Sequence, residues 1–285
     1  MNARLTLRAG FARLLLALGV TELGAREEAL PALDFGVLAP REVRVFVPPG
    51  GVQRDTPVLL ALDGQMMPAW HLAETVARLA AKGEITAPLV VAIPAGEDRV
   101  EEYGMAGAAD YAGRGKQAAA FQRFVLGAVL PAVRARYGVA AEPARTGVMG
   151  ASMGGLAAFD LAWGHPEALG FAGIFSGSLW WRGDNSSVGA QQASRLALRL
   201  ARETRAVPRL RLWFEAGTKD ETDDRDGNGV IDAIQDTTEL MDALAARGFR
   251  RGRETRYVEV AGGEHNEATW ARALPDFLRW ALPPR

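Results

Sequence analysis

The feature of this chain that most constrains its fold is a repeated alternation between short apolar runs and longer runs with helical spacing. The short runs, rich in β-forming residues, cover residues 41–47, 58–62, 89–93, 146–149, 171–175, 210–214 and 255–260. Between them, apolar residues recur at helical spacing over residues 69–82, 118–136, 156–163, 191–202, 237–247 and 267–280. Because strands that alternate with helices form parallel sheets, the pattern predicts an α/β fold with a mostly parallel central sheet flanked by helices.

The strand count and one helix carry further expectations. A short run at 4–7 would add an edge strand, which makes about eight strands in all. With that strand counted, the run at 146–149 is the fifth, 210–214 the seventh and 255–260 the eighth. Pro131 is expected to kink the second helix, because proline has no N–H to donate. Ligands of such sheets bind beyond the carboxyl ends of the strands, so the residues that follow these runs are the candidates for chemistry.

The length of the chain indicates one domain. At 285 residues and 48% hydrophobic composition, the chain can bury one sizeable core and does not require two. We assign residues 41–285 to the folded domain and treat 1–40 as an N-terminal segment of uncertain role. Arginines before the apolar run at 14–18 resemble a secretory signal, but the run is short and no small-residue cleavage pattern follows it. A cytoplasmic protein is therefore the default expectation, with secretion left open.

Charge and cysteine content exclude several kinds of partner and chemistry. The chain has 33 basic and 34 acidic residues and a formal net charge of −1, so no global field favours nucleic acid or anionic lipid. No apolar stretch is judged long enough to span a membrane. There are no cysteines, which excludes disulfides, thiolate metal sites and cysteine nucleophiles. A small-molecule partner fits best, and the oligomeric state is not indicated.

A serine follows the fifth strand in a tight glycine-rich turn. The sequence GASMGG spans 150–155 and places Ser152 between an expected strand and an expected helix. This G-x-S-x-G pattern is typical of a nucleophile elbow, in which small residues such as Gly150 and Gly154 prevent collisions around a strained serine. Glycine-rich strand-to-helix turns also occur without catalysis. The context favours a nucleophile at Ser152.

The chain offers three histidines as a general base: His71, His165 and His265. His265 lies in GGEHNEATW, directly after the eighth strand, where glycines allow the loop to turn back toward the elbow. His165 precedes a proline at the end of the elbow helix, and His71 lies in an earlier helix. We therefore predict that His265 activates the serine, against the alternative of an exposed loop histidine.

Several acids follow the seventh strand and compete for the third position of a catalytic triad. Asp220 is the first choice, because Gly217 and Thr218 form a turn that would place it at the carboxyl edge of the sheet. Glu221 is the close alternative. Glu215 is interpreted as a buried structural partner at the end of the strand.

Two backbone N–H groups are candidates for an oxyanion hole. The N–H of Met153 begins the helix after the elbow, where the helix dipole favours negative charge. The N–H of Gln65, in the sequence LDGQ after the run at 58–62, is the second candidate. Asp63-Gly64 is also a common turn dipeptide, so an ordinary turn is the alternative for that loop.

Segments over most of the chain after residue 40 resemble the putative-esterase branch of the α/β-hydrolases, which includes esterase D, feruloyl esterases, enterochelin esterases and the mycolyltransferases. They are LDGQ at 62–65, IPAGEDRVEEY at 93–103, DYAGRGKQAAAF at 110–121, GASMGG at 150–155, FSGSLWW at 175–181, GTKDE at 217–221 and GGEHNEATW at 262–270. The resemblance implies an α/β-hydrolase fold, hydrolysis or transfer of acyl groups through an acyl-serine, and no organic cofactor. It leaves the triad acid open between Asp220 and Glu221.

Side chains after the sixth strand are candidates for substrate binding. Ser178, Trp180 and Trp181 follow the run at 171–175 and lie near enough to line an acyl or aryl pocket. Core packing is the alternative, and adjacent tryptophans on a strand would divide between core and pocket. Another group, Arg99, Glu102 and Tyr111, is interpreted as surface ion pairing rather than substrate orientation.

An acidic loop after the candidate triad acid resembles a calcium loop. The candidate ligands in DRDGNGVIDAIQD are Asp224, Asp226, Asn228, the Val230 carbonyl, Asp232 and Asp236. Gln235 stands where a bidentate glutamate is usual, so affinity should suffer. We expect structural Ca²⁺ here, and a solvated acidic turn without metal is the alternative.

The leading hypothesis is a serine carboxylic-ester hydrolase that acts on a small-molecule ester through an acyl-serine intermediate. An acyltransferase with the same triad is the first alternative. A non-catalytic, calcium-stabilised binding protein of the same fold is the second.

Overall fold

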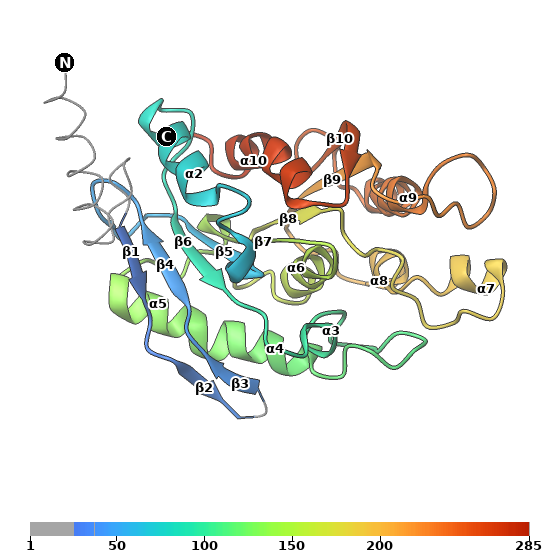
Figure 1. Ribbon diagram of the computed structural model, residues 1–285, viewed down its shortest axis with the longest axis horizontal. Coiled ribbons are helices and arrows are strands. Elements are labelled where there is room, and N and C mark those ends of the chain that lie inside the picture. Colours follow the sequence, from blue (N-terminus) through green and yellow to red (C-terminus); the bar gives the residue numbers. More distant parts are fainter. Residues whose placement is uncertain (1–25, 37, 285) are drawn as a thin grey trace, which may run out of the picture.

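A computed structural model describes residues 26–36 and 38–284, which fold around an eight-stranded sheet with strand order β1-β4-β6-β5-β7-β8-β9-β10 (Figure 1). Its strands are β1 (Arg26–Ala29), β4 (Arg44–Val47), β5 (Val58–Leu62), β6 (Leu89–Ile93), β7 (Thr146–Ala151), β8 (Phe171–Phe175), β9 (Arg211–Lys219) and β10 (Thr255–Glu264). Strands β2 (Leu33–Phe35) and β3 (Leu38–Arg41) form a separate antiparallel pair. Within the eight-stranded sheet, strands β5 to β10 pair in parallel with one another, whereas β4 pairs antiparallel with both β1 and β6. The predicted α/β architecture with a mostly parallel sheet is confirmed.

The N-terminal edge of the sheet differs from the expectation. The eighth strand is β1, Arg26–Ala29, which pairs antiparallel with β4. The run at 4–7, like the rest of 1–25, lies outside the described residues. Strand β1 has the sequence REEA, whose charged side chains give no apolar alternation but suit a sheet edge. Residues 26–36 and 38–40, which belong to the segment 1–40 of uncertain role, therefore contribute to the fold.

Helices cover both faces of the sheet because the central strands are apolar on both sides. In β5, Val58, Leu60 and Leu62 join one hydrophobic cluster, while Leu59 and Ala61 join the other. Helices α2 (Leu72–Ala81) and α10 (Glu267–Ala281) cover one face (Figure 1). The other face is covered by α4 (Ala118–Phe124), α5 (Leu130–Tyr137), α6 (Met153–Gly164), α8 (Leu196–Glu203) and α9 (Asp232–Ala246).

The helix expected over 118–136 is continuous but irregular. Between α4 and α5 lies a π-helical segment, η2 (Val125–Val129), in which the Leu130 N–H bonds to the carbonyl of Val125. Pro131 lies in the first turn of α5, directly after this segment, and the kink expected there stays a prediction. The stretch Ala118–Tyr137 is long and apolar enough to cross a membrane, contrary to the expectation from the sequence. In this fold it packs against the sheet with half of that stretch buried, as a core helix does.

The structure also contains four shorter helices that the sequence pattern did not delimit. They are η1 (Gly64–Met66), α3 (Arg99–Glu102), η3 (Pro143–Arg145) and α7 (Val188–Ala193). The single helix expected over 191–202 is two helices, α7 and α8, because Arg195 adopts an extended backbone between them. The buried Arg195 side chain pairs there with Asp236 and Glu239 of α9.

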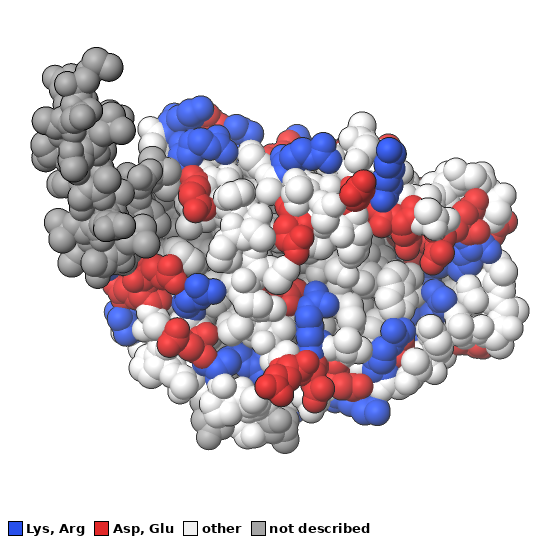
Figure 2. Space-filling model, viewed as in Figure 1, with Lys and Arg blue, Asp and Glu red and all other residues white. Residues whose placement is uncertain are grey.

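Charged side chains of both signs are interspersed on the face shown in Figure 2. This distribution agrees with the near balance of 33 basic and 34 acidic residues. The face drawn shows no broad surface of a single sign.

Candidate active site

Ser152 lies in a strained turn between β7 and α6. Its backbone adopts φ 56° and ψ −125°, a conformation that is costly for a residue with a side chain. Its N–H donates to the carbonyl of Phe175 at 2.9 Å. A Cβ atom at Gly150 would lie 2.5 Å from the Gly154 carbonyl oxygen, so the turn requires glycine there. The strand, sharp turn and helix of a nucleophile elbow are therefore present.

His265 lies beside Asp220 at the carboxyl edge of the sheet. His265 follows β10 and precedes Asn266, whose side chain caps α10. Its Nδ1 is 3.4 Å from Asp220 Oδ1, and its ring packs edge-on against Trp270 with centroids 5.3 Å apart. Asp220 follows β9 and is buried.

Neither of the other histidines lies in this arrangement. His71 has a left-handed backbone at the start of α2, and His165 ends α6 with Nδ1 3.2 Å from Glu167. Both are absent from the described residues that line the cavity around Ser152.

The two acids that the sequence left open lie in different surroundings. Among the described residues, only Asp220 of the two makes a contact with His265. Glu221 lines the same cavity, and its pKa is raised to about 7, chiefly by burial and also by the nearby charge of Asp232. The geometry therefore favours Asp220 as the partner of His265.

A buried hydrogen-bond cluster behind Asp220 was not expected from the sequence. Ser176 follows β8 with φ 40°, and its Oγ lies 3.0 Å from Asp220 Oδ1 and 3.3 Å from Glu215 Oε2. The indole N–H of Trp270 donates to the same hydroxyl at 2.8 Å. Glu215 is buried in β9 as expected, and burial, followed by the charge of Asp220, raises its pKa to about 8.

Ser152, His265 and Asp220 line one cavity of about 440 Å³. The other lining residues are Arg99, Met153, Ser176, Gly177, Ser178, Trp180, Glu221, Ala233 and Asp236. Ser178 Oγ lies 3.5 Å from Ser152 Oγ. The neighbouring tryptophans divide, because Trp180 lines the cavity while Trp181 is fully buried in the core.

The loop after β5 is tied to the elbow by an ion pair that the sequence did not reveal. Asp63 has a left-handed backbone, and Arg99 binds both of its carboxylate oxygens at 2.7 Å. The same guanidinium lies 3.4 Å from the carbonyl of Ala151, directly before the nucleophile. Gln65 follows in this loop, with its side-chain oxygen accepting the N–H of Ala95. Met153 lines the cavity, whereas Gln65 is not among the described residues that do.

The expectation of surface ion pairing for Arg99, Glu102 and Tyr111 is wrong. Arg99 lines the cavity and pairs with Asp63. Glu102 is buried in a two-bond ion pair with Arg41, at 2.6 Å for each bond. Tyr111 is exposed, and its ring is 5.6 Å from the Arg114 guanidinium.

The acidic loop after Asp220 is held together by its own side chains and by arginine. Asp224 accepts the backbone N–H groups of Asn228 and Gly229, and Asp226 accepts the side chain of Gln235. Arg225 pairs with Asp232 at 3.3 Å and with Asp236 at 2.5 Å. In residues 26–36 and 38–284 no three His, Cys, Asp or Glu side chains converge as they would around a metal ion. Two of the candidate ligands, Asp232 and Asp236, are thus occupied by Arg225, and calcium binding stays a prediction that requires Arg225 to release both acids.

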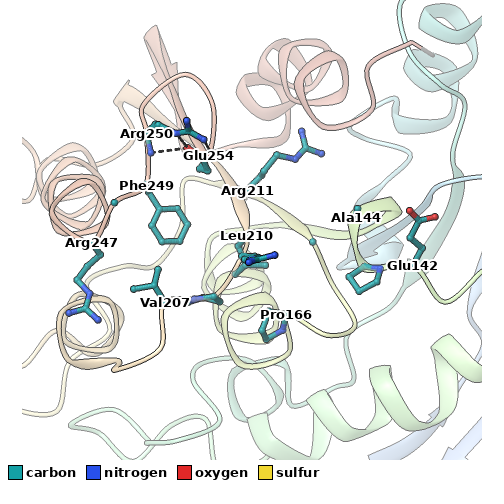
Figure 3. Close-up of a pocket in the computed structure, with 15 residues that line it drawn as sticks. Glu142, Ala144, Pro166, Val207, Leu210, Arg211, Arg247, Phe249, Arg250 and Glu254 are labelled. Carbon is teal, nitrogen blue, oxygen red and sulfur yellow. Dashed lines mark hydrogen bonds and ion pairs between the residues drawn. The ribbon is translucent and has the colours of Figure 1, made fainter.

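A larger cavity lies elsewhere, at the amino-terminal ends of β7, β8, β9 and β10 (Figure 3). It measures about 820 Å³, and apolar side chains such as Leu210 and Phe249 lie beside arginines. The described residues that line it include no serine, histidine or aspartate. The smaller cavity around Ser152 is therefore the one equipped for nucleophilic chemistry.

The sheet, the elbow after β7 and the His265–Asp220 pair define an α/β-hydrolase fold. The chain belongs to the esterase family, because the model described as "Putative esterase" matches residues 38–281. No curated protein matches this sequence at a significant level.

Solved structures of esterases share the fold at low sequence identity. The enterobactin esterase of Shigella flexneri superimposes with a TM-score of 0.67 at 21% identity, over 92% of this chain and 60% of that one. A ferulic acid esterase superimposes with a TM-score of 0.66 at 17% identity, over 90% of this chain and 97% of that one. The siderophore hydrolase of Aspergillus nidulans superimposes with a TM-score of 0.62 at 20% identity, over 90% of this chain and 97% of that one. This chain thus spans about three fifths of the enterobactin esterase. Family membership supports ester hydrolysis, and likenesses at these identities show the fold alone.

Proposed function

We propose that this protein is a serine carboxylic-ester hydrolase that acts on a small-molecule ester. The observation that carries the proposal is the meeting of three groups in one cavity. Ser152 stands in a strained elbow, and His265 lies 3.4 Å from the buried Asp220. A nucleophile, a base and an acid that orients the base are the parts that acyl transfer to serine requires.

The first half of the reaction forms an acyl-serine. Ser152 Oγ attacks the ester carbonyl carbon while His265 Nε2 takes the hydroxyl proton. The tetrahedral intermediate then expels the alcohol, which receives that proton from His265. In the second half, water gives a proton to His265 and attacks the acyl carbon, which releases the carboxylic acid and restores Ser152.

Asp220 and two backbone donors support these steps. Asp220 accepts from His265 Nδ1–H and stabilises the imidazolium that forms, without taking its proton. Met153 begins α6, where an N–H has no acceptor within the helix, and in this proposal that N–H donates to the developing oxyanion. Gln65 supplies the second donor in this proposal, from the loop that Arg99 and Asp63 tie to the elbow.

Substrate choice is proposed to depend on the cavity wall. Trp180 offers an aromatic surface, and the side chain of Arg99 is about one third exposed (32%) in spite of its ion pair. The structural relatives include an enterobactin esterase and a ferulic acid esterase. We infer an ester small enough for a cavity of about 440 Å³ to hold its acyl group. Transfer of that group to an alcohol instead of water stays an alternative outcome.

Hydrolysis of a panel of aryl and alkyl p-nitrophenyl esters tests the proposal. Ser152→Ala and His265→Ala should each lower kcat by at least about 10³-fold, because the triad acts as a unit. Release of p-nitrophenol that these variants leave unchanged would contradict it. Adding a short alcohol and measuring ester formed against acid formed separates transfer from hydrolysis.

A further inference from the structure

Glu215 is a buried acid that the proposed reaction does not use. It is fully buried, at 0% exposure, in β9, where it lies beside Phe175 of β8 and Val258 of β10 in the sheet register. One of its oxygens, Oε2, is 3.3 Å from Ser176 Oγ. The other, Oε1, makes no hydrogen bond to the described residues.

The contacts at Ser176 can each be a full hydrogen bond only if one of two carboxyl groups carries a proton. A serine hydroxyl has one proton to donate and two lone pairs that accept. The Trp270 indole can only donate, so it takes one lone pair. Asp220 and Glu215 both approach the same hydroxyl, at 3.0 Å and 3.3 Å. If both carboxyl groups were ionised, only one could accept the hydroxyl proton. The other carboxylate would then lie against a lone pair of Ser176 Oγ, with no proton between the two oxygens.

The surroundings assign that proton to Glu215 rather than to Asp220. Asp220 faces His265, which becomes cationic during the proposed reaction. Each acid has one buried oxygen without a hydrogen bond among the described residues, Glu215 Oε1 and Asp220 Oδ2, so this feature does not separate them. Glu215 has no ion pair there, whereas Asp220 lies beside His265, and a neighbouring cation favours the ionised form of Asp220. The other titratable or charged groups that act on it are Asp220 itself, Tyr257 of β10 and the exposed Arg272 of α10.

We propose that Glu215 is a positioning residue: as a neutral carboxylic acid it donates to Ser176 and so directs the Ser176 hydroxyl proton onto Asp220. This inference rests on the proposed function, because its effect on rate passes through Asp220 and His265. The order of donation is Glu215 to Ser176 Oγ, Trp270 to Ser176 Oγ, and Ser176 to Asp220. Every lone pair and proton of the hydroxyl is then used.

Ionisation would remove the proton that Glu215 donates to Ser176, so Glu215 would become a hydrogen-bond acceptor. Burial, then the charge of Asp220, raises the pKa of Glu215 to about 8. Above that pH the Glu215 carboxylate competes with Asp220 for the single Ser176 proton. We therefore expect kcat/KM to fall on the alkaline side with the titration of Glu215.

The test compares pH profiles of kcat/KM for p-nitrophenyl ester hydrolysis by the whole chain. Glu215→Gln keeps a neutral donor at the same place but does not titrate. At about pH 9 the wild type should retain roughly one tenth of its neutral-pH value, and Glu215→Gln should change by less than about twofold. Ser176→Ala removes the hydroxyl that links Glu215 to Asp220. The pH profile of this variant should therefore also lack the fall of kcat/KM at high pH, which we call the alkaline limb. Glu259→Gln, an exposed acid on β10, is the matched control and should keep the limb.

A second measurement is independent of catalysis. The infrared difference spectrum of wild type minus Glu215→Gln at about pH 7 should contain the C=O band of a protonated carboxyl group. Absence of that band overturns the inference, as does an alkaline limb that survives in Glu215→Gln or Ser176→Ala. A wild type without Ser152-dependent hydrolysis would instead refute the proposed function, and the infrared band would still decide the protonation of Glu215.

Discussion

Replacing Glu215 with glutamine should change how stability depends on pH. Glu215 has a pKa of about 8 in the folded protein, against an ordinary value of 4.5, so between these values the folded state holds a proton that the unfolded state has lost. Stability contributed by this group is present below pH 4.5 and is lost as pH rises toward 8. Each pH unit in that window costs about 1.4 kcal/mol, and the slope flattens near the folded pKa. The loss between about pH 6 and about pH 8 is therefore about 2 kcal/mol.

Urea unfolding at a series of pH values measures this effect. Glu215→Gln removes the titration, so the free energy of unfolding of the wild type should fall relative to the variant by about 2 kcal/mol over that range. The exposed Glu259→Gln variant should follow the wild type. Parallel curves for wild type and Glu215→Gln would refute the protonated, buried acid on which the reasoning depends.

Three further predictions concern the elbow, the triad acid and the acidic loop. Gly150→Ala places a Cβ 2.5 Å from the Gly154 carbonyl oxygen, and should lower unfolding free energy by about 1–3 kcal/mol in urea titrations; an unchanged midpoint contradicts the crowding. Asp220→Asn should lower kcat by about 10⁴-fold and Glu221→Gln by far less; the reverse order would make Glu221 the acid. Calcium added to chelator-treated protein should raise Tm if Arg225 yields Asp232 and Asp236, and a flat calorimetric titration removes the calcium hypothesis.

The sheet was largely predictable because its central strands are buried on both faces. Strands β5, β6 and β8 match the predicted runs at both ends, since continuous apolar runs end where the chain leaves the core. Strand β1 was missed because its charged residues Glu27 and Glu28 lie at the sheet edge, where apolar alternation is not required. The break between α7 and α8 was missed because it depends on the ion pairs of Arg195 with a distant helix.

The site was predictable where local sequence determines the backbone. Gly150 and Gly154 mark the elbow of Ser152, and the order of strands places His265 after the last one. The choice between Asp220 and Glu221 depends on which adjacent side chain turns toward His265, and adjacent positions carry no signal for that. The role of Ser176 depends on three partners from β9, the loop after it and α10. Only the folded chain brings these partners together.

Covalent labelling with a fluorophosphonate probe tests the central claim that Ser152 is an activated nucleophile. Mass spectrometry of wild-type protein should find a single adduct on Ser152, because His265 must raise the reactivity of that hydroxyl above the other serines. Labelling should be lost in Ser152→Ala and strongly slowed in His265→Ala, with both variants folded by circular dichroism. A wild type that stays unlabelled, or an adduct that persists in Ser152→Ala, would contradict the account.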